Sequence, residues 1–174
     1  VSVNRWIPDD REIKGIIQLS HGMVEHSLRY DRLGSILAEN GYIFCAHDHR
    51  GHGRTAQRAE QTGKGSFGIL AEKDGFNRVV KDLDAVLLKT KADYPGLKSI
   101  LLGHSFCSFV AQAFIEKYSC DISACVLCGI AGPQNVTVHF GKFIADFVHF
   151  FHGSVYRSAI LKKAAFGKYT KHIP

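Results

Sequence analysis

The chain has 174 residues, of which 45% are hydrophobic and 22% are charged, so it can bury one core and does not have the composition of a disordered segment. Its formal net charge of +6 is local, because residues 1–132 carry +1 and residues 133–174 carry +5. This excess of basic residues is modest and no recognised nucleic-acid-binding motif accompanies it, which argues against a nucleic-acid partner.

The apolar runs and the cysteines indicate the compartment. No apolar run approaches the length that spans a membrane, and no basic leader followed by an apolar stretch comes before the first motif. The five cysteines are odd in number and lie mostly in apolar runs, which indicates reduced thiols. We therefore expect a cytoplasmic protein without disulfides.

The hydrophobic pattern alternates between strands and helices along the chain. Short apolar runs predict strands at 14–20, 42–46, 99–102 and 123–128. Apolar residues at helical spacing predict helices at 28–39, 74–92 and 106–118, the second with Asp74 as its N-cap, while 51–68 reads as a polar, glycine-rich loop. This alternation predicts an α/β fold with a mostly parallel sheet flanked by helices.

The most informative motif is Gly103-His104-Ser105-Phe106-Cys107, between a predicted strand and a predicted helix. A serine on such a turn exposes its hydroxyl, and the helix N-terminus offers free N–H groups to an oxyanion. The motif matches G-x-S-x-G with Cys107 in place of the last glycine. The pentapeptide alone leaves open an ordinary strand-to-helix turn, and it also leaves open what Cys107 does to the turn.

Two further motifs follow the first two predicted strands, HGMVEHSLRY at 21–30 and DHRGHG at 48–53. With the GHS of 103–105, they make the chain similar to the monoacylglycerol lipase and lysophospholipase group of α/β-hydrolases, which is related to the serine aminopeptidases. The resemblance covers essentially the whole chain and is clearest from 14 to 132. It implies an α/β-hydrolase fold that hydrolyses monoacylglycerol- or lysophospholipid-type esters without a cofactor or metal.

The resemblance also implies roles for particular residues. Ser105 would be the nucleophile, and the backbone N–H groups of Met23 and Phe106 would form the oxyanion hole. The supporting positions around that site would be His21, Gly22, Gly103 and His104. Structural fastening, rather than chemistry, is expected of Asp48, Arg50, His52 and Gly53.

The expected acid and base have no match after Ser105. In this fold the order along the chain is serine, then acid, then histidine. The acids after Ser105 are Glu116, Asp121 and Asp146, the histidines are His139, His149, His152 and His172, and none of them matches the family's acid or base position. The chain therefore resembles the first portion of a hydrolase, with the core at 1–132, the start of a helical cap at 133–174, and a C-terminal truncation. A catalytically silent fragment or binding module is the alternative.

The basic C-terminal segment carries an aromatic stripe at helical spacing, composed of Phe140, Phe143, Ile144, Phe147, Val148 and Phe151. A second helix is expected at 155–165. Burial of the stripe against the protein's own core is the favoured interpretation, and peripheral contact of 140–165 with a lipid surface is the other.

Two metal-binding alternatives are weaker. His47, His49 and His52 have the H-x-H-x-x-H spacing of a zinc hydrolase, but Gly51 stands where that motif has an aspartate. The three cysteines at 120, 125 and 128 have the spacing that begins one iron–sulfur pattern, but a strand directs the last two to opposite faces, so we expect buried structural cysteines.

Overall fold

The computed structural model describes residues 1–130, 142, 144–148, 150, 151, 153, 156, 158, 159 and 163. The chain forms two compact units, Val1–Ile130 and Ala131–Pro174. The first unit contains the sheet and every motif discussed above. Within the described residues, no helix is both long enough and apolar enough to cross a membrane.

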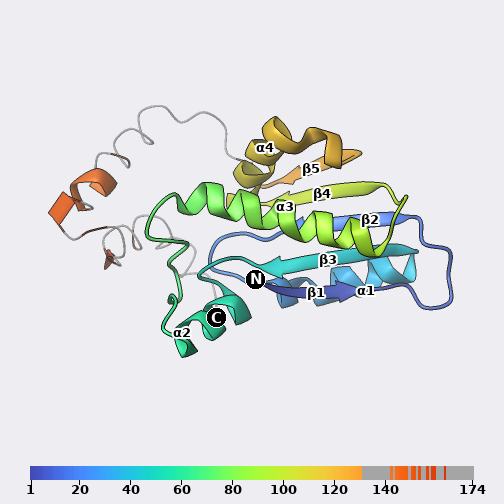
Figure 1. The fold of residues 1–174 in the computed structure, drawn as a ribbon, viewed down its shortest axis with the longest axis horizontal. Helices are drawn as coiled ribbons and strands as arrows, with labels where there is room; N and C mark the ends of the chain where they lie inside the picture. The colour runs from blue at the N-terminus through green and yellow to red at the C-terminus, as the bar shows by residue number, and fades with distance from the viewer. Residues whose placement is uncertain are drawn as a thin grey trace. The chain divides into compact units, whose positions relative to one another are not determined.

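A five-stranded sheet forms the centre of the first unit, with the order β1-β3-β2-β4-β5 (Figure 1). The strands are β1 (Ser2–Trp6), β2 (Gly15–Ser20), β3 (Tyr42–Asp48), β4 (Ser99–His104) and β5 (Ala124–Cys128). Only β1 is antiparallel, pairing with β3, and the other pairs are parallel. The expected α/β fold with a mostly parallel sheet is therefore confirmed.

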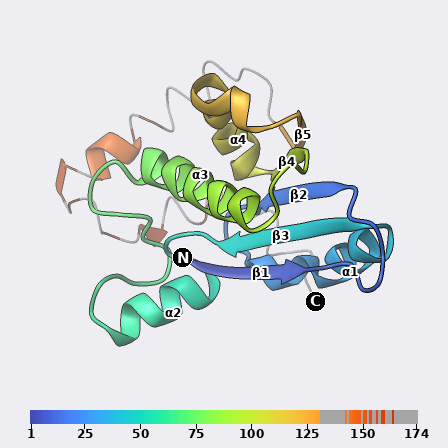
Figure 2. The same cartoon turned by 45° about the vertical axis from the view of Figure 1, so that its right-hand side comes forward.

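Helices cover both faces of the sheet. In both ribbon views α1 (Asp31–Glu39) lies behind the strands and α3 (Gly75–Asp93) lies in front of them (Figures 1 and 2). The helix α4 (Phe106–Tyr118) packs against α3 and β4. The other helical segments of the first unit are η1 (Ser27–Tyr30), α2 (Gly53–Gln61) and η2 (Ser119–Asp121).

The two covered faces have separate hydrophobic clusters. On one face α3 and α4 bury Leu83, Leu87 and Phe114 against Leu101 of β4. On the other, Leu19, Phe44 and Ala46 pack against partly buried side chains of β1 and α1. Because successive side chains of a strand point to opposite faces, one sheet supplies both clusters. This packing fixes the ends of the strands, where the motifs lie.

The structure differs from the sequence-based expectations at three places. The strand β1 was not expected, and neither was α2, which lies inside the stretch expected to be a loop and buries only Ala56. Asp74 does precede α3, but it has a left-handed backbone (φ 57°), and its side chain accepts from Asn77 rather than capping an amide. The α2 sequence has few apolar residues, so the apolar spacing that predicts a helix is sparse in it.

The aromatic stripe is only partly within the described residues. Residues 144–148, 150 and 151 are helical, and the rings of Phe147 and Phe151 lie 4.8 Å apart. Both side chains are exposed, at 59% and 62%. Phe140, Phe143 and most of the expected helix at 155–165 lie outside the described residues.

Buried histidines form a cluster where β2 and β3 end. The ring centroids of His21 and His49 are 4.1 Å apart, and those of His47 and His49 are 4.7 Å apart. Burial lowers the pKa of His21 to about 4 and that of His47 to about 3, so both rings are neutral near pH 7. Neither ring nitrogen of His47 has a hydrogen-bond partner among the described residues.

We expect His47→Leu to stabilise the fold and to reduce its sensitivity to acid. Below about pH 6.5 the unfolded chain binds protons at His21 and His47 while the folded chain does not, so their contribution to stability is complete above that pH and falls towards pH 4. Leucine removes one such site together with two unpaired nitrogens.

Urea denaturation at about pH 7.5 and about pH 5 measures the effect. Between these conditions the variant should lose about 2 kcal/mol less unfolding free energy than the wild type. The exposed His26 provides the control, because His26→Gln should leave the pH dependence unchanged. Equal losses in the wild type and His47→Leu would contradict the assignment.

Candidate active site

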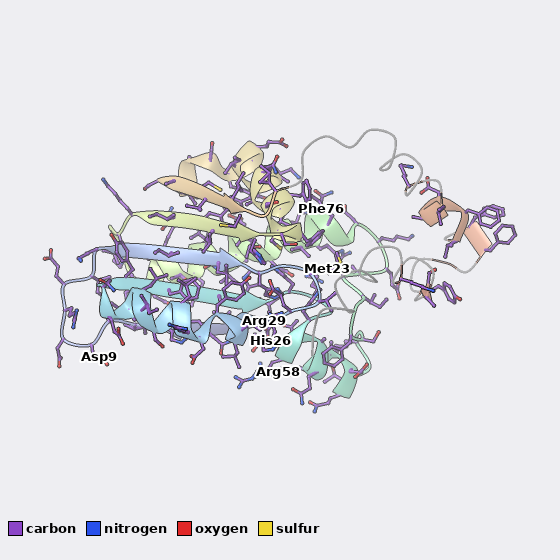
Figure 3. All side chains as sticks on the ribbon, turned by 180° about the vertical axis from the view of Figure 1, so that it is seen from behind. Asp9, Met23, His26, Arg29, Arg58 and Phe76 are labelled. Atoms are coloured by element: carbon purple, nitrogen blue, oxygen red, sulfur yellow. The ribbon has the colours of Figure 1, made fainter. Side chains whose placement is uncertain are left out.

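The motifs meet at the carboxyl edge of the parallel strands, where ligands bind in open α/β sheets. The loop after β2 begins at His21, the β3 motif continues to Gly53, and Ser105 follows β4. Figure 3 shows Met23 at this end of the sheet, with Phe76 from the start of α3 at the same end.

Ser105 lies on a strained turn between β4 and α4. Its backbone angles are φ 54° and ψ −121°, a conformation that costs a non-glycine residue on the order of 1–3 kcal/mol. Two backbone hydrogen bonds hold it: the Ser105 amide donates to the carbonyl of Cys128 (2.8 Å), and the Ser108 amide donates to the carbonyl of Ser105 (2.8 Å). The serine is exposed. The predicted strand-turn-helix context is therefore present.

Gly103 allows α4 to approach β4 closely. A Cβ on Gly103 would lie 2.5 Å from the Cys107 carbonyl oxygen and 2.8 Å from the Ala111 Cβ. Cys107 itself is fully buried. Position 103 therefore requires glycine, whereas position 107 accommodates a side chain.

Gly22 brings the loop after β2 against the serine. A Cβ on Gly22 would lie 3.2 Å from the Cβ of Ser105 and 3.3 Å from Nδ1 of His104. No hydrogen bond between described residues uses the N–H group of either Met23 or Phe106. The sequence-predicted residues of the site therefore lie together, and two backbone donors have no partner among the described residues.

A carboxylate and a hydroxyl that the sequence did not single out complete this loop. Oε1 of Glu25 accepts from the Gly22 amide and from the Tyr30 hydroxyl (2.8 Å), and it lies 3.1 Å from Nδ1 of His104. Burial alone would raise the pKa of Glu25, but these hydrogen bonds lower it below its ordinary value. His104 thus lies within hydrogen-bonding distance of both Glu25 and Tyr30. The signal available in the sequence was the spacing of Glu25 and Tyr30 within the 21–30 motif.

The residues expected to fasten the β3 end do so. Asp48 accepts from the Ser27 amide (2.8 Å), the Ser27 hydroxyl (2.6 Å) and the Arg54 amide (2.8 Å). Burial alone would raise the pKa of Asp48, but these hydrogen bonds lower it below its ordinary value. Arg50 makes a two-pronged ion pair with Asp82 at 2.6 and 2.9 Å.

His52 and Gly53 are fasteners as well. Nε2 of His52 accepts from the amide of Val24, a residue with a positive φ of 63°, and Nδ1 lies 2.9 Å from the Arg50 carbonyl oxygen. A Cβ on Gly53 would lie 2.4 Å from the Asp48 carboxyl group. These contacts fix the loop that carries Met23.

The acids that follow Ser105 do not supply a catalytic partner. Glu116 lies far along α4, Asp121 pairs with Lys91 at 3.2 Å, and Asp146 pairs with Lys142 at 2.6 Å. His139, His149, His152 and His172 lie outside the described residues. No hydrogen bond between described residues reaches the Ser105 hydroxyl.

The alternative metal patterns find little support in the geometry. Within the part of the chain that the structure describes, no three His, Cys, Asp or Glu side chains are grouped to hold a metal ion. Cys125 and Cys128 alternate in exposure along β5, as a strand requires. The expectation that these cysteines are buried was wrong, because Cys120 and Cys128 are exposed and Cys125 is half-buried on an edge strand.

A mostly parallel sheet with an exposed serine on a strained turn between β4 and α4 defines an α/β-hydrolase. The sequence profile of the family described as serine aminopeptidase, S33, matches residues 11–170, so the chain belongs to this family.

Relatives and solved structures agree with that assignment. The monoacylglycerol lipase of Mycolicibacterium smegmatis is 32% identical over 126 residues, which are 72% of this chain and 41% of the relative. The human monoglyceride lipase is 35% identical over 127 residues, 71% of this chain and 38% of its own. A carboxyl esterase from Bacillus coagulans, solved in complex with glycerol, superposes with a TM-score of 0.77 at 25% identity, covering 92% of this chain and 50% of the esterase. The chain thus spans between about two fifths and one half of the length of these proteins.

We expect Gly103→Ala to destabilise the fold, because its Cβ would meet the backbone of α4 and the side chain of Ala111. Overpacking of this kind costs on the order of 1–3 kcal/mol. Urea denaturation monitored by circular dichroism measures the loss. The control is Gly65→Ala, whose Cβ would make only an ordinary 3.4 Å contact with Ala59, and which should change stability by less than about 0.5 kcal/mol. Equal stability of the two variants would contradict the close approach at Gly103.

Proposed function

We propose that this chain carries the nucleophile of a serine ester hydrolase that acts on monoacylglycerol- or lysophospholipid-type substrates. The observation that carries the proposal is the exposed Ser105 on its strained turn, directly beside Gly22. The names of the Mycolicibacterium smegmatis and human relatives support monoacylglycerols as substrates. The lysophospholipid part rests on the sequence resemblance. Residues 133–174 would begin the cap of this hydrolase.

In the proposed reaction, the Ser105 oxygen attacks the ester carbonyl carbon and the carbonyl oxygen becomes an oxyanion. The free N–H groups of Met23 and Phe106 would bind that oxyanion, an interaction worth several kcal/mol in a site that excludes water. The alkoxide leaving group takes a proton as the acyl-serine forms, and water later releases the acid. Backbone donors suffice for the oxyanion, so no metal or cofactor is needed.

The serine proton requires a histidine base that is held by a carboxylate. The described residues place no such histidine on the Ser105 hydroxyl, since the imidazole of His104 faces Glu25 and Tyr30 through Nδ1. The base and its acid therefore lie outside the described residues in this proposal. A silent module that binds an ester without hydrolysing it has the same Ser105 turn but lacks the base.

A fluorophosphonate probe tests the nucleophile in the complete gene product. We expect covalent labelling at Ser105 that Ser105→Ala abolishes, because only an activated serine reacts with the probe. The matched control is Ser108→Ala, one turn further along α4 and fully buried, which should keep the labelling. Labelling that persists in Ser105→Ala would remove the assignment, and an unlabelled wild type would favour the silent module.

The 174-residue chain alone should hydrolyse a short-chain ester negligibly, because none of its histidines after Ser105 matches the family's base position and loss of the catalytic histidine costs on the order of 10⁶ in turnover. Robust hydrolysis by this chain that Ser105→Ala abolishes would contradict this prediction and would place the base among the chain's own residues.

Peripheral contact of 140–165 with a lipid surface is part of the proposal. The exposed rings of Phe147 and Phe151, with exposed Lys142 and Lys163 in the same segment, support it. Replacing both phenylalanines with serine should weaken cosedimentation with anionic liposomes about tenfold or more, because each buried ring contributes roughly 1.5–3 kcal/mol. Leu88→Ser, at an exposed position of α3, is the control. Unchanged cosedimentation of the double variant would exclude this contact.

A further inference from the structure

Cys107 directs its thiol inward, towards the ends of β2 and β3. Its Sγ lies 3.0 Å from Nε2 of His49, the residue that follows β3. Burial raises the pKa of Cys107 to about 12, so the thiol is protonated and acts as a small neutral polar group. The side chain that replaces the motif glycine therefore has a specific partner.

The contacts of His49 fix where its ring hydrogen lies. Nε2 of His49 is 3.0 Å from the carbonyl oxygen of His21 and 3.4 Å from the Ser20 hydroxyl. A carbonyl oxygen can only accept, so Nε2 carries the hydrogen. The Cys107 sulfur lies 3.0 Å from the same nitrogen, so towards this N–H group the sulfur is an acceptor.

His21 passes this arrangement on to the loop beside the serine. The backbone amide of His49 donates to Nε2 of His21 (3.1 Å), so the hydrogen of the neutral His21 ring is on Nδ1, which donates to the Gly22 carbonyl (2.8 Å). Because the peptide bond after Gly22 is trans, the N–H of Met23 points opposite to that carbonyl. The His21 ring thus sets the direction of the Met23 donor.

We propose that Cys107 is a positioning residue for this loop. Its thiol holds the His49 ring against the His21 carbonyl, and the His21 ring in turn holds the Gly22–Met23 peptide. The first turn of α4, next to the nucleophile, is thereby linked to the Met23 amide, one of the two proposed oxyanion donors. The proposal rests on the proposed function, since the direction of the Met23 amide matters only if the turn after β4 supplies the nucleophile.

Nitrogen NMR of the histidine rings and hydrogen exchange of the His49 amide test the link in the 174-residue chain. In Cys107→Ala we expect His21 to lose its single Nδ1–H tautomer to a mixture of both tautomers. The His49 amide should exchange about tenfold faster or more, relative to core amides of α3. Cys107→Ser restores a hydrogen-bonding atom, so it should keep one tautomer and an exchange rate within about threefold of the wild type.

The matched control is Cys45→Ala, because Cys45 is also fully buried but its thiol contacts Thr90 (3.5 Å) instead of His49. It should leave the His21 tautomer unchanged. A single His21 tautomer in Cys107→Ala, the same response in Cys45→Ala, or no rescue by Cys107→Ser would each overturn the proposal.

Should Cys107→Ala fail to fold, Cys107→Val fills the space of the thiol without offering a hydrogen-bonding atom. A tautomer mixture in that variant supports the link, and the wild-type tautomer overturns it. Neither readout depends on Ser105 reactivity, and a Ser105→Ala chain should give the wild-type ring spectrum. A failed fluorophosphonate experiment therefore leaves this result standing, and the reverse also holds.

Discussion

The site depends on the close contact between the loop after β2 and the turn after β4. The position where Gly22 would carry a Cβ lies 3.2 Å from Ser105 Cβ, so any other residue at position 22 would press on the serine. The contact can form because β2 and β4 are adjacent parallel strands whose carboxyl ends meet at one edge. The two covered faces of the sheet hold those ends in register, and the strained Ser105 backbone persists because the surrounding packing determines it.

The loop after β2 is held from two chemically different sides. On one side the carboxylate of Glu25, whose pKa is lowered, hydrogen-bonds with the Gly22 amide, the Tyr30 hydroxyl and the His104 imidazole. On the other side a chain of neutral groups runs from Cys107 to His21. The partners of Glu25 compensate its charge, whereas the neutral groups lie fully inside the protein. The loop is therefore held by hydrogen bonds on both sides.

Sequence reasoning predicted the parts of this structure that depend on local pattern. The helix at 106–118 has the predicted limits, and the strands around it differ by one or two residues, because their apolar periods match their burial. It missed β1, which is defined by antiparallel pairing with β3 rather than by a hydrophobic pattern of its own. It also missed α2, because that helix has too few apolar residues to show helical spacing. For the site, the motifs located Ser105 and Gly22, but they could not reveal that Glu25, Tyr30 and His104 share one hydrogen-bond network, since only folding brings residues 25 and 104 together.

The placement of β5 has a consequence for how firmly Ser105 is held. The serine amide bonds to the carbonyl of Cys128, the last residue of the outermost strand, whose outward side chains are exposed. Edge strands with little buried area open more readily than central ones, so the conformation of the serine turn is tied to a strand that has no fully buried residue. Any additional strand that pairs with the edge of β5 that no described strand occupies stabilises β5 and, by linkage, the strained turn as well. How well the Ser105 backbone is ordered therefore depends on the chain segment that pairs with β5.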